Sequence, residues 1–213
     1  MNLVENLKWR YATKKFDASK MVSKDELQKL KEAVQLSASS YGLQLYKVLI
    51  VSNKELKEKL KPAAWGQDQL TDASHIFVFC NYTERKNEHI DDYIRATSKI
   101  QDTPIEKLEG YSNLIKQSTS SKSDVEWQSW SQKQTYLALS NLLAACAELK
   151  IDSCPIEGFE PEKFNTILGL EEQGLNAAVI ATVGYRSSED HTQFRKKVRK
   201  HFSLRLYSSR CSR

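Results

Sequence analysis

Two short cationic runs lie near opposite ends of the 213-residue chain, and together they could bind an anion. Residues 10–17 read Arg-Tyr-Ala-Thr-Lys-Lys-Phe-Asp, and residues 195–200 read Arg-Lys-Lys-Val-Arg-Lys. On charge pattern alone, a short run of cations is most often a solvated surface. If the fold brings the two runs together, Arg can form charge-assisted forks with a dianionic phosphate and Lys can add point charges.

The rest of the sequence carries no local signature of catalysis by side chains alone. None of the 7 glycines falls into Rossmann or P-loop spacing, and neither GxSxG nor HExxH occurs. None of the 4 histidines has a neighbour at metal-ligand spacing, so no metal site is expected. An enzyme with this sequence would therefore depend on a bound cofactor for its chemistry.

The composition is that of an ordinary globular protein, with 40% hydrophobic and 28% charged residues and a net charge of +5. We expect a single domain over residues 1–205 and a disordered tail at 206–213. The 4 cysteines form no CxxC pair and are expected to be reduced and mostly buried. No apolar run approaches the about 20 residues that cross a bilayer, and the N-terminus lacks the pattern of a secretory signal. The sequence predicts a cytoplasmic protein without a membrane partner.

Hydrophobic patterns predict the elements that must position these residues. Ser23 and Glu26 form a capping box that predicts a helix to about residue 37. Strands are predicted at 46–51, 75–82 and 176–185, an extended piece with a turn at 151–159, a loop at 118–123, and helices at 53–60, within 86–122, at 127–149 and at 161–168. The second half of the 127–149 helix is apolar nearly all round, which indicates a central core helix and a large interface. Strands scattered among helices predict an α+β fold with a largely covered sheet.

Six motifs in register resemble the FMN-dependent nitroreductase family. They are residues 10–17, the Ser-Ala-Ser-Ser of 37–40 with Gln44, the Asp-Ala-Ser-His of 72–75, the Pro-Ile-Glu-Gly-Phe of 155–159, the Val-Gly-Tyr of 183–185, and Lys197-x-Arg199. The likeness runs from about residue 5 to residue 200 and is nearest to the oxygen-insensitive NAD(P)H nitroreductase and dihydropteridine reductase branch. It implies a central mixed, mainly antiparallel sheet surrounded by helices, a long central core helix and an intertwined homodimer.

The resemblance also implies how FMN is held. Arg10 and Lys14 would contact its phosphate, ribityl chain and ring, while Lys197 and Arg199 would contact the phosphate. The resemblance places FMN at the subunit interface. The cofactor-binding residues expected in this way are Arg10, Tyr11, Ala12, Lys14, Ser39, Ser40, Gln44, Gln69, Pro155, Ile156, Glu157, Gly158, Lys197 and Arg199. Ser39 and Ser40 fall where the family supplies contacts from the partner subunit.

Lys14 and Glu157 are the residues that the resemblance assigns to catalysis. A Lys beside the N1–C2=O edge would stabilise the anionic reduced flavin, and Lys14 is the candidate. The backbone N–H of Glu157 would face the flavin N5. Gly66 stands where close relatives often carry an Asn that bonds the flavin ring, and Gln67 or Gln69 could supply the missing amide.

Three aromatic residues, Tyr41, Trp65 and Tyr111, are candidates for the substrate opening, where their rings would stack on planar acceptors. These implications combine in an FMN-dependent oxidoreductase. It would take hydride from NADH or NADPH and pass two electrons to nitroaromatics, quinones or related acceptors by a ping-pong reaction. A dihydropteridine, flavin or quinone reductase would share all of these residues, so that alternative stays open.

A nucleic-acid-binding protein using residues 195–213 is the non-enzyme alternative. Such binding would weaken steeply with salt. The cations of this segment lack a recognition motif and interleaved stacking aromatics, which counts against this function. We therefore expect small-molecule acceptors and no nucleic-acid partner.

Overall fold

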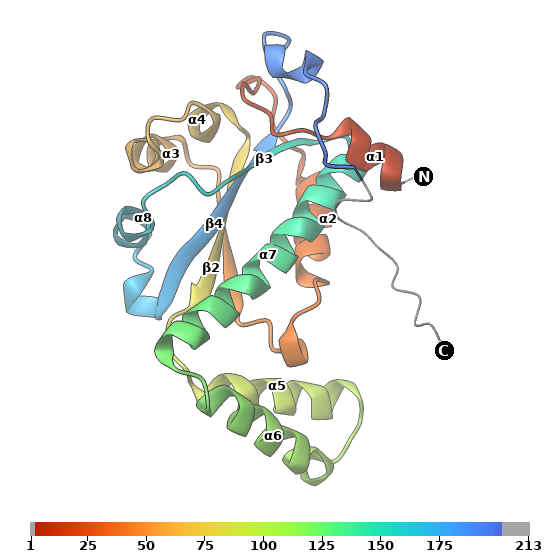
Figure 1. Ribbon diagram of the computed structural model, residues 1–213, viewed down its shortest axis with the longest axis vertical. Coiled ribbons are helices and arrows are strands. Elements are labelled where there is room, and N and C mark those ends of the chain that lie inside the picture. Colours follow the sequence, from red (N-terminus) through yellow and green to blue (C-terminus); the bar gives the residue numbers. More distant parts are fainter. Residues whose placement is uncertain (1–2, 202–213) are drawn as a thin grey trace.

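A computed structural model of the chain describes residues 3–201, so the tail expected at 206–213 lies outside the described residues. At its centre is a 4-stranded antiparallel sheet with the order β1-β2-β4-β3 (Figure 1). The strands are β1 (Tyr46–Val51), β2 (His75–Tyr82), β3 (Asp152–Ile156) and β4 (Leu175–Gly184). The predicted strands and extended piece are thereby confirmed.

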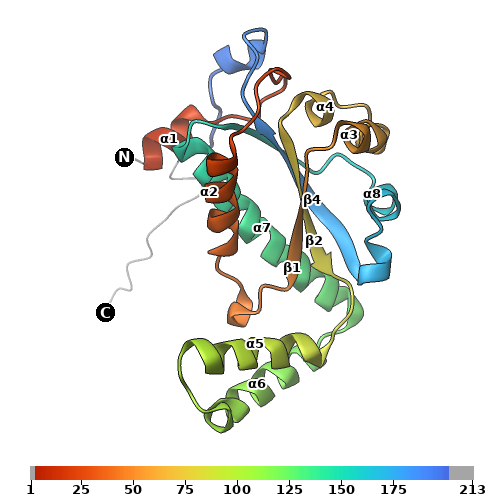
Figure 2. The ribbon, with the colours of Figure 1, turned by 180° about the vertical axis from the view of Figure 1, so that it is seen from behind.

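Helices cover both faces of this sheet (Figures 1 and 2). They are α1 (Leu3–Trp9), α2 (Lys24–Gln35), α3 (Lys54–Leu60), α4 (Gln69–Asp72), α5 (Asn87–Ile100), α6 (Glu109–Ser120), α7 (Asp124–Glu148) and α8 (Pro161–Leu168). Side chains alternate along β2, so Ile76 and Val78 pack towards α3, α4 and α8, whereas Phe77 and Phe79 pack towards α2 and α7. The chain has the predicted α+β architecture.

The long helix α7 is the central core helix that the sequence predicts. Its N-terminus carries a capping box, in which the Ser123 hydroxyl accepts the N–H of Glu126 and the Glu126 carboxylate accepts the N–H of Ser123. Its second half buries Ala138, Leu139 and Leu142 against the sheet. No helix within residues 3–201 is both long enough and apolar enough to cross a membrane.

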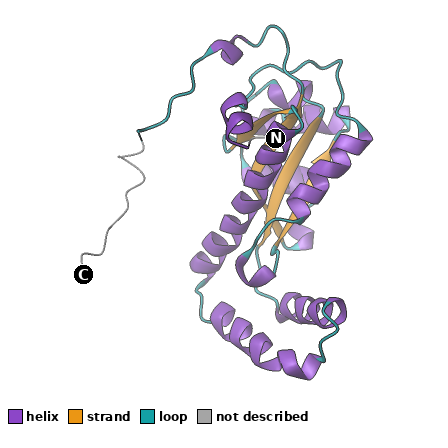
Figure 3. Cartoon of the chain, turned by 90° about the vertical axis from the view of Figure 1, so that its right-hand side faces the viewer, coloured by secondary structure: helices purple, strands orange, loops and turns teal. Residues whose placement is uncertain are grey.

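The predicted loop at 118–123 is partly wrong, because α6 continues to Ser120. The hydroxyl of Thr119 donates to the carbonyl of Ile115 at 2.9 Å, and that of Ser120 donates to the carbonyl of Gln117 at 3.1 Å. These bonds back into the helix let small polar residues stay helical. Helices α5 and α6 form an antiparallel pair that projects beyond the end of the sheet with its own small core (Figure 3).

The first cationic run, residues 10–17, is attached to the end of the sheet by backbone pairing. Ala12 forms an isolated parallel bridge with Ser153, and Phe16 forms an antiparallel bridge with Arg186. Phe16 is 3% exposed and joins the core. This pairing fixes the first run beside the end of β4, from which the chain continues to the second run.

Candidate functional site

The two cationic runs meet at one cavity. It has a volume of about 490 Å³ and lies where α1, the first run, the end of β3 and the segment after β4 come together (Figure 1). Its lining comprises Lys8, Trp9, Arg10, Tyr11, Ala12, Lys14, Pro155, Thr192, Gln193, Arg195, Lys196, Lys197 and Arg199. The fold thus brings residues from opposite ends of the sequence, such as Lys8 and Arg199, to the same cavity.

The electrostatics of this cavity favour an anion. No Asp or Glu belongs to the lining, so the cations around it are not neutralised from within. Burial, and next the nearby charge of Arg199, lower the pKa of Arg10, whose buried Nε has no hydrogen-bond partner among the described residues. Burial lowers the pKa of Lys197 as well, and the charges of Arg10 and Arg199 add to that shift. Such crowding of like charges is relieved when an anion binds.

The side chain of Lys197 reaches the cavity but also closes the end of α1. Its ammonium donates to the carbonyl oxygens of Leu7 at 2.5 Å and Lys8 at 3.0 Å, and to that of Arg10. These are carbonyls at the C-terminal end of the helix, where a cation is favoured. The guanidinium of Arg199 donates to the carbonyl of Val198 at 2.7 Å, which leaves its other donors for a ligand.

A buried carboxylate, Asp190, holds the first run in place. Its side chain accepts hydrogen bonds from the Tyr11 phenol and the backbone N–H of Lys14, both at 3.0 Å. It also accepts the N–H and hydroxyl of Thr192, which begins the approach to the second run. The sequence analysis missed this residue. An Asp two residues before a Thr signals a local turn, but nothing in that signal indicates a contact with Tyr11.

A second buried carboxylate, Asp152, positions the aromatic wall of the cavity. Asp152 is 5% exposed and accepts the backbone N–H and the Nε–H of Arg186, both at 2.8 Å. The guanidinium of Arg186 lies 4.5 Å from the ring centre of Trp9 and 4.6 Å from that of Tyr11. Arg186 therefore joins a buried carboxylate to two aromatic rings that line the cavity.

The side chain of Lys14 lies beside β3. Its ammonium is 3.8 Å from the Sγ of Cys154, and the next residue, Pro155, lines the same cavity. Burial raises the pKa of the Cys154 thiol, although the charge of Lys14 opposes the shift. The thiol is therefore protonated and uncharged at neutral pH, so it forms no ion pair with the Lys14 side chain.

The 155–158 segment is contacted from two sides. The Glu157 carboxylate accepts the phenol of Tyr136 at 2.6 Å, and the carbonyl of Gly158 accepts the side-chain amide of Gln67 at 2.7 Å. Trp65, 69% exposed, lies directly over Gly158. Of the two amides considered for this region, Gln67 reaches the segment, whereas Gln69 is buried at the start of α4.

Among the described residues, the lining of this cavity does not include Ser39, Ser40, Tyr41, Gln44 or Tyr111. The backbone N–H of Ser40 donates to the side chain of Gln134 at 2.8 Å, and the amide of Gln44 donates to the carbonyl of Gln35 at 2.6 Å. The hydroxyls of Tyr41 and Ser118 are 2.9 Å apart, and the phenol of Tyr111 donates to the carbonyl of Tyr41 at 3.4 Å. Ser39 accepts the N–H of Gln44 at 2.9 Å. Within one chain, these described residues therefore do not line the cavity that contains Arg10.

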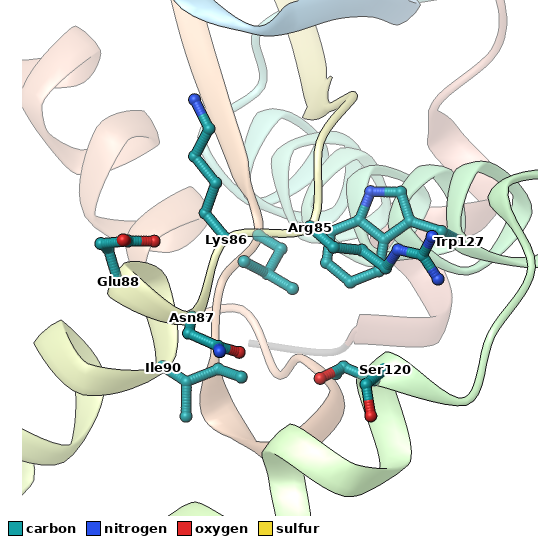
Figure 4. A pocket seen from close by; sticks show the side chains of 9 residues that line it. Arg85, Lys86, Asn87, Glu88, Ile90, Ser120 and Trp127 are labelled. Carbon is teal, nitrogen blue, oxygen red and sulfur yellow. The ribbon is translucent and has the colours of Figure 1, made fainter.

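Another cavity, of about 420 Å³, lies between α5, α6 and α7 and is lined by Arg85 and Lys86 (Figure 4). Its cations are already paired. Arg85 binds the carboxylate of Asp124 at 2.5 Å, and Lys86 binds that of Glu84 at 2.8 Å. Its lining also includes Glu88 and none of the predicted site residues. Within residues 3–201, no cluster of three or more His, Cys, Asp or Glu side chains could hold a metal ion.

Comparison with known proteins agrees with this geometry. The model of the Nitroreductase family matches residues 7–185. YfkO, a candidate NAD(P)H nitroreductase of Bacillus subtilis, is 34% identical to this chain over 209 residues, which cover 92% of this chain and 94% of the relative. The family match therefore includes the first cationic run, all four strands and the 155–158 segment.

Solved structures share the fold. A candidate NAD(P)H:FMN oxidoreductase of Staphylococcus epidermidis superposes with a TM-score of 0.87 at 18% identity, covering 98% of this chain and 96% of that one. A candidate nitroreductase of Exiguobacterium sibiricum, solved in complex with FMN, gives a TM-score of 0.83 at 17% identity over 98% of each chain. Given the family match over residues 7–185 and this common fold, the chain belongs to the Nitroreductase family, a family of oxidoreductases.

Proposed function

We propose that this protein is an FMN-dependent oxidoreductase that uses NADH or NADPH to reduce nitroaromatics, quinones or related acceptors by a ping-pong reaction. The observation that carries the proposal is the cavity at Arg10, which has cations from both ends of the chain and no carboxylate in its lining. The relative in Bacillus subtilis is named for NAD(P)H nitroreduction, and the neighbour from Exiguobacterium sibiricum contains FMN, which supports the same function.

The residues present fit a flavin mononucleotide. A phosphate monoester is a dianion, and the unpartnered Nε of Arg10 is a buried donor that requires an acceptor. Arg10 and Arg199 would bind the phosphate, with Lys197 adding charge next to α1. Tyr11 and Ala12 line the cavity wall, and Pro155 marks where the 155–158 segment would meet the ring system.

When bound, FMN supplies two-electron chemistry, in which hydride is taken from the nicotinamide donor and passed to the acceptor. The chain's own residues provide charge and orientation. The ammonium of Lys14 would stabilise negative charge on the reduced ring, because a fixed cation in a partly buried site is screened less than in water. The backbone N–H of Glu157 would act as a fixed donor to the ring edge. Ile156 and Gly158 complete the segment.

We propose a homodimer in which each cofactor site takes residues from both copies. Ser39, Ser40 and Gln44 lie far from the cavity of their own chain, so they would serve the site of the second copy. The middle of α7 exposes Tyr136 and Leu137 at 42% and 47%, an apolar surface for such an interface. One domain over residues 1–205 and a cytoplasmic location belong to the same proposal.

The acceptor would bind between Trp65 of one copy and Tyr41 and Tyr111 of the other. The exposed indole of Trp65 offers a flat apolar surface, which suits planar aromatic acceptors. A dihydropteridine, flavin or quinone reductase would use the same surfaces, and Gln69 is retained as a candidate cofactor contact at the start of α4.

A direct test begins with FMN uptake. The purified protein should be yellow or should quench the fluorescence of added FMN with a stoichiometry of one per chain. Anaerobic stopped-flow mixing with NADH and with NADPH should bleach the flavin absorbance. Subsequent mixing with nitroaromatic, quinone, dihydropteridine and free-flavin acceptors should identify the class that reoxidises it fastest. A protein that stays colourless after incubation with excess FMN would overturn the proposal.

A further inference from the structure

The 155–158 segment begins with the last two residues of the edge strand β3, Pro155 and Ile156, which pair with β4. Glu157 and Gly158 then leave the sheet and lie between two other elements. On one side is the middle of α7, and on the other is the 62–67 loop, which follows α3. The segment turns tightly after β3, because the N–H of Phe159 donates to the carbonyl of Glu157 at 3.0 Å. A tight turn outside the sheet has few backbone partners of its own, so its orientation depends on side chains that reach it.

The first contact comes from α7. The phenol of Tyr136 donates to the Glu157 carboxylate at 2.6 Å, a charge-assisted bond between side chains 21 positions apart. Burial, followed by the hydrogen bond to Glu157, raises the pKa of Tyr136 to about 12. The phenol therefore remains protonated and donating through neutral pH.

The second contact comes from the 62–67 loop. The amide of Gln67 donates at once to the carbonyl of Gly158 at 2.7 Å and to that of Ala64 at 3.0 Å, so it bridges the two backbones. The N–H of Glu160 donates to the carbonyl of Ala63 at 2.8 Å and adds a backbone bond between the same two elements. Gln67 thus belongs to a set of neighbouring hydrogen bonds that connect the loop to the segment.

The two contacts act on neighbouring peptide groups. Tyr136 binds the side chain of Glu157, and Gln67 binds the carbonyl of Gly158, so the two contacts hold neighbouring residues of the turn from two different elements. A turn held at two successive residues has less freedom to change its backbone dihedrals, including those that orient the N–H of Glu157, than a turn without such contacts.

We propose that Tyr136 and Gln67 are positioning residues, which together fix the 155–158 segment so that the N–H of Glu157 keeps one orientation towards the FMN ring. This inference rests on the proposed function, because it takes the segment to be the flavin-facing one. Neither residue would touch the reacting atoms, so both would act through the turn that they hold.

The first experiment uses the FMN-free protein. Hydrogen–deuterium exchange of the backbone amides at 156–160 should be faster in Tyr136→Phe and Gln67→Ala by between about twofold and tenfold, the range that the loss of one hydrogen bond produces. The double variant should exchange faster than either. Unchanged protection at 156–160 in both single variants would overturn the proposal.

The chain offers matched controls. Tyr185 donates to the Glu26 carboxylate at 3.0 Å, the same kind of bond at another place, and Gln173 donates to the carbonyl of Gly169 at 3.0 Å. Tyr185→Phe and Gln173→Ala should leave exchange at 156–160 as in the wild type. Glu157→Gln keeps an acceptor for Tyr136, so its exchange at 156–160 should match that of the wild type. Glu157→Leu removes the acceptor, so its exchange there should match that of Tyr136→Phe.

The second experiment uses the FMN-loaded protein and separates positioning from binding. Tyr136→Phe and Gln67→Ala should change the midpoint potential of bound FMN and slow its reduction by nicotinamide several-fold, with the Kd for FMN within about twofold of the wild type. Wild-type potential and rate in both variants would overturn the positioning role and leave the proposed function standing. Failure of the wild type to bind FMN would overturn both.

Discussion

The phenol of Tyr11 donates a hydrogen bond of 3.0 Å to the carboxylate of Asp190, which lies 179 positions further along the chain. The same carboxylate oxygen accepts the backbone N–H of Lys14 at 3.0 Å. Cations alone would repel one another at this place, so a buried carboxylate behind the cavity is what lets the two cationic runs approach. Asp190 stabilises the arrangement without belonging to the cavity lining.

This arrangement predicts an acid-dependent loss of stability. Burial raises the pKa of Asp190, but hydrogen bonds from Thr192, Lys14 and Tyr11 outweigh it, so the pKa is lowered from its ordinary value of 3.8. A carboxyl whose folded pKa is lowered contributes stability above its unfolded pKa, and that contribution is lost as the pH falls through the folded pKa. Asp190→Asn should reduce the free energy of unfolding by about 2 kcal/mol at pH 7, and the difference should shrink below about pH 4.

Urea unfolding of the wild type and Asp190→Asn between pH 3 and 7 measures this difference. Asp102→Asn is the control, because Asp102 is exposed in a loop with a positive φ of 49°, a conformation that Asn tolerates. The control should follow the wild type at every pH. A constant difference between wild type and Asp190→Asn down to pH 3 would contradict the prediction.

Local patterns predicted the fold well. β1 and β2 begin and end at the predicted residues, and the capping box at Ser23 starts α2 as predicted. The predicted 127–149 helix begins earlier, at Asp124, behind a second capping box at Ser123. These features depend on residues within a few positions of one another. The loop predicted at 118–123 was partly wrong because hydroxyl groups that favour turns can also bond back into a helix, as Thr119 does.

Only those residues of the candidate site that belong to a recognisable sequence motif could be predicted. The structure brings Arg10, Lys14 and Pro155 to one cavity. The sequence could not indicate Asp190 or Asp152, because a buried carboxylate that bonds distant backbone and side-chain donors has no local spacing. It also could not show that Ser40 lies far from Arg10 in one chain, since that depends on the length and direction of α2.

Replacing Arg10 should weaken FMN binding more than any change at its charged neighbour Lys15. Arg10 is partly buried with an unpartnered donor, whereas Lys15 is exposed and pairs with Glu189. We expect Arg10→Gln to raise the Kd for FMN by about tenfold to a hundredfold, the loss expected for hydrogen bonds to a charged group. Lys15→Gln should change it by less than about twofold. Fluorescence titration at two ionic strengths measures both, and an unchanged Kd for Arg10→Gln would contradict the proposed phosphate site.

A site built from two copies predicts complementation between variants. Homodimers of Arg10→Gln and of Ser40→Asp should each bind FMN poorly, the second because a carboxylate would repel an anionic cofactor. In a heterodimer of the two, one site carries both substitutions and the other carries neither. Differently tagged, co-purified heterodimers should therefore bind half of the wild-type FMN with wild-type affinity. If Ser40 served its own chain, both sites would be damaged and no FMN binding would return.

The contact between Trp65 and Gly158 predicts a change in acceptor preference. A Cβ added at Gly158 would lie 2.7 Å from the indole Cζ3 of Trp65, closer than a non-bonded contact allows. Because the indole is exposed and its side chain can rotate, it should move while the backbone stays. Gly158→Ala should therefore cost less than about 1 kcal/mol of stability. It should lower kcat/KM for planar nitroaromatics by about threefold to tenfold relative to ferricyanide, which has no ring to stack.

Gly110→Ala is the matched control, since a Cβ there meets no atom within 4 Å and the residue lies inside α6. It should stabilise the protein by up to about 1 kcal/mol through helix propensity and leave the ratio of the two acceptors unchanged. A lowered ratio in Gly158→Ala alone would assign acceptor stacking to Trp65. Equal ratios in wild type, Gly158→Ala and Gly110→Ala would mean that planar acceptors bind without this indole, and the 62–67 loop would then serve only to hold the 155–158 segment.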